Sequence, residues 1–548
     1  MSLKEEILAL TKQLVAVPSV NGTAGERNLA LFIERYLREI PYFQEYPDRV
    51  IVQELKNDPL GRRNVLALLK GEKKPSGDTI LLHGHMDTVG VEDYGALKDC
   101  AFSCDALEER LSQLNLPEEV RADLASGEWL FGRGACDMKG GVAVFLVLLR
   151  HLSERAGELS GNILLSVNPV EENLHTGIIE ALEVLERLQK EEGLRYLFAV
   201  NNDYICPAFP GDTTRCVYSG AVGKLLPCFY IRGKETHVGQ CFEGFDASML
   251  AAELVRIINL NPDFCDGYNG EYSLPPSVLK LQDLKPEYNV QTACSAFLYF
   301  NLFVHNRSVP EILKLLKEAA GQAFENVLAS INGRYQAYCA LSGIKFQPID
   351  YPRQVLEYAE LFRMAEKSYA GDLEQETQKM AEELLAKGED KRTVPLKIAE
   401  RLCEIAQVKT PTMVVFFAAP YCPHNTLKSE DPQERALLAQ ITELVTAFGG
   451  ESGETFRVMQ FFPSLSDSSY LKIDDDARSL ETLIGNFPAY SRIYPLPFER
   501  IRGLNIAGLD YGCFGKDAHK WTERVYIPYS FGVLPKLVLK TIEEFLMK

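Results

Sequence analysis

The first 215 residues alternate short apolar runs with segments of helical periodicity, and this alternation restricts the possible folds more than any other feature of the chain. A mostly parallel sheet covered by helices has this pattern. We therefore predict an α/β fold with a mostly parallel central sheet and flanking helices. The strands are predicted over residues 79–83, 162–168 and 196–201, and the helices over residues 138–155 and 175–190.

The length of 548 residues predicts at least two domains, because single hydrophobic cores stop growing at about 250 to 300 residues. From residue 216 the pattern changes to strand-like segments with two helical patterns, which indicates a small α+β domain inserted in the first. A charged helical stretch at residues 351–407 extends the insertion. We expect residues 1–215 and 426–548 to form the α/β domain and residues 216–425 to form the inserted domain.

The formal net charge of −18 argues against partners that bind basic surfaces. Nucleic acid and anionic lipid both need such surfaces, so we expect no nucleic-acid partner and no membrane partner. Lys and Glu interrupt the first 22 residues, unlike the apolar segment of a signal peptide. Thirteen cysteines without CxxC spacing fit reduced thiols. The sequence thus predicts a cytoplasmic protein whose partners are small molecules.

Side chains that can bind metal ions follow the predicted strands. His85 and Asp87 stand in LLHGHMDTV at the end of the first strand, and a carboxylate near a metal-binding histidine can fix its tautomer. Asp137 lies in the glycine-rich GRGACDMKGG before a helix, and Glu171 and Glu172 directly follow the next strand. Each feature has an ordinary alternative, namely a common HxD pattern, a helix N-cap and a solvated loop.

Two further positions complete the pattern. Asp203 follows the strand predicted over residues 196–201, and His519 lies near the C-terminus. Together these positions offer oxygen and imidazole ligands, which suit Zn²⁺. Because ligands bind at the carboxyl ends of strands in sheets of this kind, a metal site is the prediction that accounts for all the positions jointly.

The order and spacing of these motifs resemble the di-zinc metallopeptidases that include aminoacylase, acetylornithine deacetylase and succinyl-diaminopimelate desuccinylase. The matching motifs are GHMDTV, GRGACDMKGG, the paired glutamates, GKETHVG and AHKWTE. The resemblance covers the chain except for residues 351–407, and the stretch GDTTRCVYSGAVGKLLPCFYIRGKETHVG looks like the bacterial arginine-utilisation branch. It implies a zinc exopeptidase-like fold, in which the α/β domain is catalytic and the inserted domain is a lid and dimerisation domain.

The resemblance implies a role for each motif residue in the catalytic domain. Two zinc ions are expected, with cobalt or manganese as alternatives. Asp87 orients His85, Glu171 is the general base, and the peptide bond after Asp137 is cis. The implied metal ligands are His85 and Asp203 for one ion, Glu172 and His519 for the other, and Asp137 for both.

Three residues of the inserted domain are implied to reach the substrate. His237 in THVG polarises the scissile carbonyl, and in dimers of the family this histidine enters the partner's site. Asn289 and Arg307 look like lid residues that contact the substrate. A homodimer through the lid domain is therefore expected. In the alternative, residues 351–407 replace the partner and His237 serves the site of its own chain.

The sequence departs from the family pattern around the glutamates. The residue before them is Val170, where the family usually has an acidic residue, and Asn173, Leu174 and His175 replace a glycine-rich continuation. His83 is interpreted as structural. The expected function is that of a metal-dependent amidohydrolase acting on an N-acyl amino acid or small peptide in arginine or amino-acid catabolism. The alternatives are a dipeptidase or aminopeptidase, and a non-catalytic metal-binding regulatory protein.

Overall fold

The computed structural model describes residues 1–464 and 466–548. By their contacts these residues divide into two compact units. The first unit comprises Met1–Val222, His424–Ile473 and Pro497–Lys548, and the second comprises Gly223–Pro423 and Asp474–Leu496. The sequence assigned residues 474–496 to the first domain. They belong to the second unit because helix α14 (Ala477–Gly485) packs against its long helix α9 (Val309–Ser342).

The first unit is built on an eight-stranded sheet whose four central strands run parallel to one another. The predicted α/β fold class with a mostly parallel centre is confirmed. β3 (Asp78–His85) and β5 (Asn162–Asn168) are buried along almost their whole length, which explains their continuous apolar sequences. In sheet order the strands are β1 (Val50–Glu54), β2 (Arg63–Leu69), β5 (Asn162–Asn168), β3 (Asp78–His85), β6 (Arg195–Asn201), β20 (Gly508–Asp510), β8 (Arg215–Tyr218) and β19 (Phe456–Met459).

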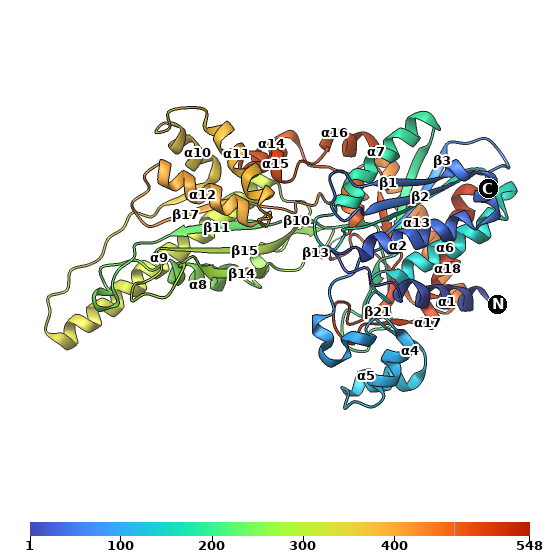
Figure 1. Ribbon diagram of the computed structural model, residues 1–548, viewed down its shortest axis with the longest axis horizontal. Helices are drawn as coiled ribbons and strands as arrows, with labels where there is room; N and C mark the ends of the chain where they lie inside the picture. The colour runs from blue at the N-terminus through green and yellow to red at the C-terminus, as the bar shows by residue number, and fades with distance from the viewer. Residues whose placement is uncertain (465) are drawn as a thin grey trace. The chain divides into compact units, whose positions relative to one another are not determined.

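Helices cover this sheet (Figure 1). Helix α6 (Lys139–Ser153) packs against β3 and β5 and is buried on nearly every residue, because α1 (Leu3–Val15) and α18 (Leu534–Leu546) cover its other sides. Helix α7 (Thr176–Glu191) packs against β2 and β5, and α2 (Gly25–Arg38) packs against β1 and β2. Both predicted helices of this region, over residues 138–155 and 175–190, are therefore present within a few residues of their expected ends.

A small four-stranded sheet in the same unit brings distant parts of the chain together. Its pairing explains why residue 519 returns to the region of residues 132 and 203. β21 (Cys513–Lys516) pairs with β7 (Tyr204–Ile205), and the segment after β21 leads into β22 (Arg524–Tyr526), which pairs with β4 (Trp129–Phe131). The strands are, in order, β4 (Trp129–Phe131), β22 (Arg524–Tyr526), β21 (Cys513–Lys516) and β7 (Tyr204–Ile205).

The second unit contains a six-stranded sheet with helices packed against it. Helix α9 is longer than the predicted 310–328 because it continues to Gly343, whose φ of 71° gives the left-handed conformation of a C-cap. The stretch 351–407 forms a short strand and three helices. The strands are β10 (Gly223–Leu225), β15 (Ser295–Val304), β11 (Pro227–Arg232), β17 (Thr412–Phe417), β16 (Val355–Glu357) and β14 (Ser277–Asp283), and the remaining helices include α8 (Ala247–Ile258), α10 (Tyr358–Glu366), α11 (Leu373–Ala386) and α12 (Thr393–Ile405).

Two further findings concern helix length and the cysteines of the described residues. No helix among them has both the length and the apolar character needed to cross a bilayer. All thirteen cysteines lie in the described part of the chain, and all are free.

Candidate metal centre

The ends of the central strands of the first unit bring the predicted metal ligands together. His85 is the last residue of β3, and Asp203 follows β6, which lies beside β3 in parallel. The glutamates follow β5, the other neighbour of β3. Because these strands run in the same direction, their carboxyl ends lie at one edge of the sheet.

The ligand atoms form two groups that share Asp137. The ligand atoms of His85, Asp137 and Asp203 lie within 4.8 Å of one another, as do those of Asp137, Glu172 and His519. Asp137 Oδ1 is 3.0 Å from His85 Nε2, and its Oδ2 is 3.0 Å from His519 Nε2. Glu172 Oε1 is also 3.0 Å from His519 Nε2. The Asp137 carboxylate therefore presents one oxygen atom to each imidazole.

A buried glutamate holds the glycine-rich turn that carries Asp137. Glu523 Oε1 accepts hydrogen bonds from the backbone N–H groups of Gly134, Cys136 and Asp137 at 2.8, 3.2 and 3.3 Å. Gly134 has a φ of 81°, and a Cβ atom there would lie 2.7 Å from Thr88. The peptide bond after Asp137 is cis, as the sequence resemblance implies.

The alternative role of Asp137 as a helix cap does not hold. Helix α6 begins at Lys139, and its N-cap residue is Met138, which makes no side-chain capping hydrogen bond. The Asp137 carboxylate instead hydrogen-bonds the His85 and His519 rings. This leaves the side chain available for the bridging position that the resemblance implies.

Asp87 contacts both His85 and the loop of the paired glutamates, and its expected role in orienting His85 stays a prediction. His85 Nδ1 is 3.0 Å from the backbone carbonyl oxygen of Asp87 but 3.7 Å from its carboxylate. The carboxylate accepts the backbone N–H groups of Glu171 and Glu172, each at 3.0 Å, and the Nδ2–H of Asn21 at 2.8 Å. The backbone of Asp87 thus holds the imidazole, and its side chain holds the paired glutamates.

The loop with the paired glutamates has an unusual backbone. Val170 and His175 both have positive φ values, 71° and 54°, and the N–H of His175 donates to the carbonyl of Val170 at 2.8 Å. The N–H of Val170 donates to Glu26 Oε1 at 3.1 Å. Positive φ is rare for a β-branched residue, so these contacts hold a conformation that the sequence alone disfavours.

Glu26 lies beneath this loop as a fully buried carboxyl group. Burial and the nearby Asp87 together raise its pKa to about 7, and the ion pair with Arg62 only partly opposes the increase. Glu26 also accepts the N–H of Gly22 at 2.9 Å. It therefore connects the loop of the glutamates to the N-terminal part of the chain.

The charges at the site favour a bound cation. Burial and the neighbouring Asp137 together raise the pKa of Asp203 to about 8. Burial also raises the pKa of Glu171 well above its usual value. For Asp137, hydrogen bonds with His519 and His85 outweigh burial and lower the pKa. Four carboxyl groups surround two imidazoles, and oxygen and imidazole donors of this kind fit a divalent metal ion such as zinc.

The three predicted lid residues belong to the second unit. His237 is exposed, and its Nδ1 accepts the N–H of Gly239 at 3.0 Å. Asn289 Oδ1 accepts the N–H of Gln291, and Arg307 donates to the carbonyl of Asp263 at 3.2 Å. These contacts all lie within the second unit, and the roles of the three residues stay predictions.

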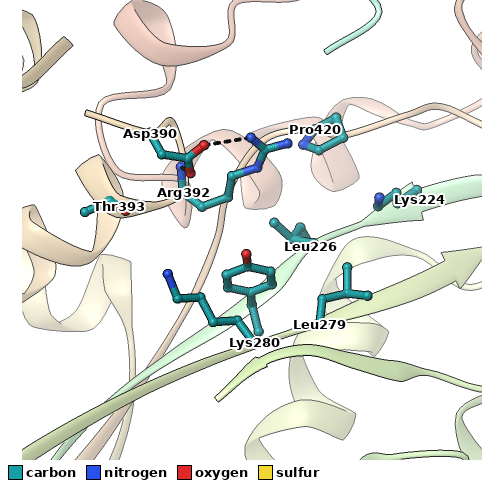
Figure 2. A pocket seen from close by; sticks show the side chains of 9 residues that line it. Lys224, Leu226, Leu279, Lys280, Asp390, Arg392, Thr393 and Pro420 are labelled. Carbon is teal, nitrogen blue, oxygen red and sulfur yellow. Dashed lines mark hydrogen bonds and ion pairs between the residues drawn. The ribbon is translucent and has the colours of Figure 1, made fainter. Parts of the chain in front are cut away.

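The second unit also has a cavity of about 370 Å³ (Figure 2). Its wall includes Lys224, Lys280 and Arg392, and Arg392 pairs with Asp390 at 2.9 Å. Among the described residues, none of the groups suited to metal binding lies in its wall. All the groups suited to metal binding among the described residues lie in the first unit.

Several supporting residues were not predicted from the sequence. Glu523 stands in the quoted AHKWTE motif, which is the only signal that could have identified it. Glu26, Asn21 and Asp467 stand in no quoted motif, and they reach the site through contacts between distant segments. His83 is fully buried and hydrogen-bonded to Ser468 Oγ at 2.9 Å, which agrees with its interpretation as structural.

Comparison with known proteins identifies the family. The chain is 40% identical to Protein RocB of Bacillus subtilis (strain 168), over 100% of this chain and 96% of that protein. It is 37% identical to the uncharacterized protein YqjN of the same organism, over 99% of this chain and 97% of that protein. A tripeptidase structure from Staphylococcus aureus shares the fold with a TM-score of 0.53 and 14% identity, and covers 99% of this chain and 98% of that chain.

The family pattern agrees with these relatives. The sequence model of Peptidase family M20/M25/M40 matches residues 81–450. This range includes the end of the strand that carries His85, the glycine-rich turn and the paired glutamates. With two relatives above 30% identity along nearly the whole chain, the protein belongs to Peptidase family M20/M25/M40 and is a metal-dependent hydrolase.

Proposed function

We propose that the protein is a two-metal amidohydrolase that cleaves an N-acyl amino acid or a small peptide. The observation that carries this proposal is the position of Asp137, with one carboxylate oxygen 3.0 Å from each of two imidazoles. A carboxylate in this position can bridge two metal ions. The other groups beside it, Asp203 and Glu172, complete one ligand set on each side.

The proposed metal ligands are the residues of the two groups that share Asp137. His85 and Asp203 hold one ion, and Glu172 and His519 hold the other. Zinc is the proposed metal, with cobalt or manganese as alternatives. When bound, the ions supply positive charge that polarises a carbonyl group and makes a water molecule more acidic.

Glu171 is the proposed general base. Its side chain is 9% exposed, and no hydrogen bond among the described residues engages its carboxylate. Its backbone N–H donates a hydrogen bond to the Asp87 carboxylate at 3.0 Å, which fixes the backbone from which the side chain extends. Glu171 takes a proton from the attacking water and returns it to the departing amine as the C–N bond breaks.

The second unit is proposed to supply substrate contacts. His237 polarises the scissile carbonyl, and Asn289 and Arg307 contact the remainder of the substrate. A hydrogen-bond donor to the developing oxyanion raises kcat by a factor on the order of 10² to 10³. His237 is exposed and thus free to meet a substrate or a second subunit, and we include a homodimer through this unit in the proposal.

The cellular setting of the proposal is amino-acid catabolism in the cytoplasm. The thirteen free cysteines support a reducing compartment. Several relatives over parts of this chain are succinyl-diaminopimelate desuccinylases, which supports an N-acylated amino acid as the substrate class. The resemblance to arginine-utilisation proteins favours substrates derived from arginine and its catabolism.

A hydrolysis screen tests the proposal. The zinc-loaded protein is incubated with N-acetyl, N-succinyl and N-formyl amino acids and with dipeptides, and the release of free amine is measured. We expect hydrolysis of at least one N-acyl amino acid and its loss in Glu171→Gln. Faster hydrolysis of dipeptides would instead identify a dipeptidase. Bound zinc without turnover of any substrate would contradict the proposal and favour a regulatory protein.

A further inference from the structure

Three consecutive buried side chains contact the ends of three different elements at the metal centre. Ser466, Asp467 and Ser468, here called the 466–468 triplet, are 2%, 2% and 3% exposed. Each pairs with a polar side chain that is itself at most 1% exposed. The partners are Asn201, His175 and His83, which come from β6, from the loop after β5 and from β3.

The first contact leads to the predicted ligand Asp203. The Nδ2–H of Asn201 donates to Ser466 Oγ at 2.8 Å, which fixes the amide of this last residue of β6. The other end of the same amide, Oδ1, accepts the backbone N–H of Asp203 at 3.2 Å. Ser466 therefore sets the orientation of an amide that in turn holds the ligand's backbone.

The second contact leads to β3. His83 Nε2 and Ser468 Oγ are 2.9 Å apart, and the imidazole is completely buried. His83 lies two residues before His85 on the same strand, so both side chains project from the same face of β3.

The third contact leads to the loop of the glutamates. The Nδ1–H of His175 donates to Asp467 Oδ1 at 3.0 Å, and the same nitrogen is 3.8 Å from Glu171 Oε1. His175 also closes the loop through its backbone N–H, which donates to Val170. Asp467 thus fixes the ring of a residue whose backbone defines the conformation of the loop.

We propose that the 466–468 triplet is a positioning device that aligns the ligand-bearing ends of β3, the β5 loop and β6. This inference rests on the proposed two-metal function. The three contacts come from one short segment, so a shift of this segment moves the three ends together. Buried polar groups need their partners, which makes each contact directional and costly to break. Side chains that support metal ligands in this way typically affect metal affinity or activity about 10- to 100-fold.

One other use of the triplet is chemically reasonable. The ligand atoms of Glu171, His175 and Asp467 lie within 4.8 Å of one another and could hold a cation. A cation there would occupy the carboxylate that the proposed reaction needs as a proton acceptor. We therefore assign Asp467 to positioning, and the experiment separates the two roles by metal stoichiometry.

The test compares Ser466→Ala, Ser468→Ala, Asp467→Ala and Asp467→Asn with the wild type. Ser153→Ala is the matched control, because Ser153 is a buried serine whose hydroxyl bonds only the helix carbonyl of Arg150. For each protein the zinc content, the zinc affinity in competition with a chelator, and kcat and KM are measured. Thermal unfolding of the metal-free proteins reports whether each variant folds.

We expect the three alanine variants to bind two zinc ions with an affinity about 10- to 100-fold weaker, and to lose kcat more than they raise KM. Asp467→Asn keeps an oxygen that accepts from His175, so it should recover most of the loss. Ser153→Ala should match the wild type. If Asp467→Ala fails to fold, the two serine variants decide the result.

Two results would overturn the inference. Unchanged zinc affinity and kcat in every triplet variant, with an active wild type, would show that the contacts do not position the ligands. A zinc content that falls from three ions to two in both Asp467 variants would identify Asp467 as a ligand. A wild type that binds no zinc and hydrolyses no substrate would instead refute the proposed function itself.

Discussion

Replacing Asp87 with Asn tests which part of this residue supports the site. The Asp87 carboxylate is fully buried and accepts three hydrogen bonds, from the backbone of Glu171 and Glu172 and from Asn21. In Asp87→Asn one oxygen remains, and the new amide N–H₂ faces a backbone N–H. Two buried donors then lack an acceptor, at about 1 to 3 kcal/mol each. We expect the free energy of unfolding to fall by about 2 to 4 kcal/mol.

Urea unfolding of the metal-free protein measures this change, and Asp212→Asn is the matched control. Asp212 also accepts two backbone N–H groups, from Ala208 and Thr214, but it is only partly buried, so water can replace the lost bond. We expect a loss below about 1 kcal/mol there. The His85 contact uses the backbone carbonyl of Asp87 and survives the substitution. Equal losses in the two variants would refute the assignment of the carboxylate to the glutamate loop.

Three further predictions follow from the same geometry. Glu171→Gln should keep two zinc ions and lower kcat by about 10²- to 10⁴-fold, whereas Glu172→Gln should lose zinc from one site; equal zinc contents would contradict the division of roles. Mixing inactive Glu171→Gln with inactive His237→Ala should restore activity if His237 acts across a dimer, and no recovery despite subunit exchange would place it in its own chain. Burial raises the pKa of Glu26 to about 7, so the folded metal-free protein retains a proton that the unfolded chain releases near pH 4.5. Its free energy of unfolding should therefore fall by about 1 to 3 kcal/mol as pH rises from about 4.5 to 7, and Glu26→Gln should remove this dependence; an unchanged pH profile in the variant would contradict it.

The parts of the fold that local patterns encode could be predicted from the sequence. The strand ending at His85 and the helix after Asp137 have continuous apolar sequences, so their type follows from the length of each run and their approximate ends from the flanking residues. Proximity of the ligands could be expected because parallel strands end at one edge of a sheet. The identity of the ligands came from the order of the motifs in the sequence.

The supporting contacts could not be predicted, because they join residues that are far apart in the chain. Glu523 and the turn at Asp137 are 386 positions apart, and His175 and Asp467 are 292 apart. Neither pair leaves a local pattern. The backbone contact of Asp87 could not be predicted for a different reason: sequence cannot distinguish a carboxylate that holds an imidazole from a backbone carbonyl that does so. Residues 474–496 were misassigned because α14 packs against α9 across a long separation.

The central claim is that two metal ions share the Asp137 carboxylate. Anomalous diffraction at the zinc absorption edge, from crystals of the zinc-loaded protein, tests it most directly. We predict two anomalous peaks on either side of Asp137, one beside His85 and Asp203 and the other beside Glu172 and His519. A single peak, or peaks that do not adjoin Asp137, would contradict the account.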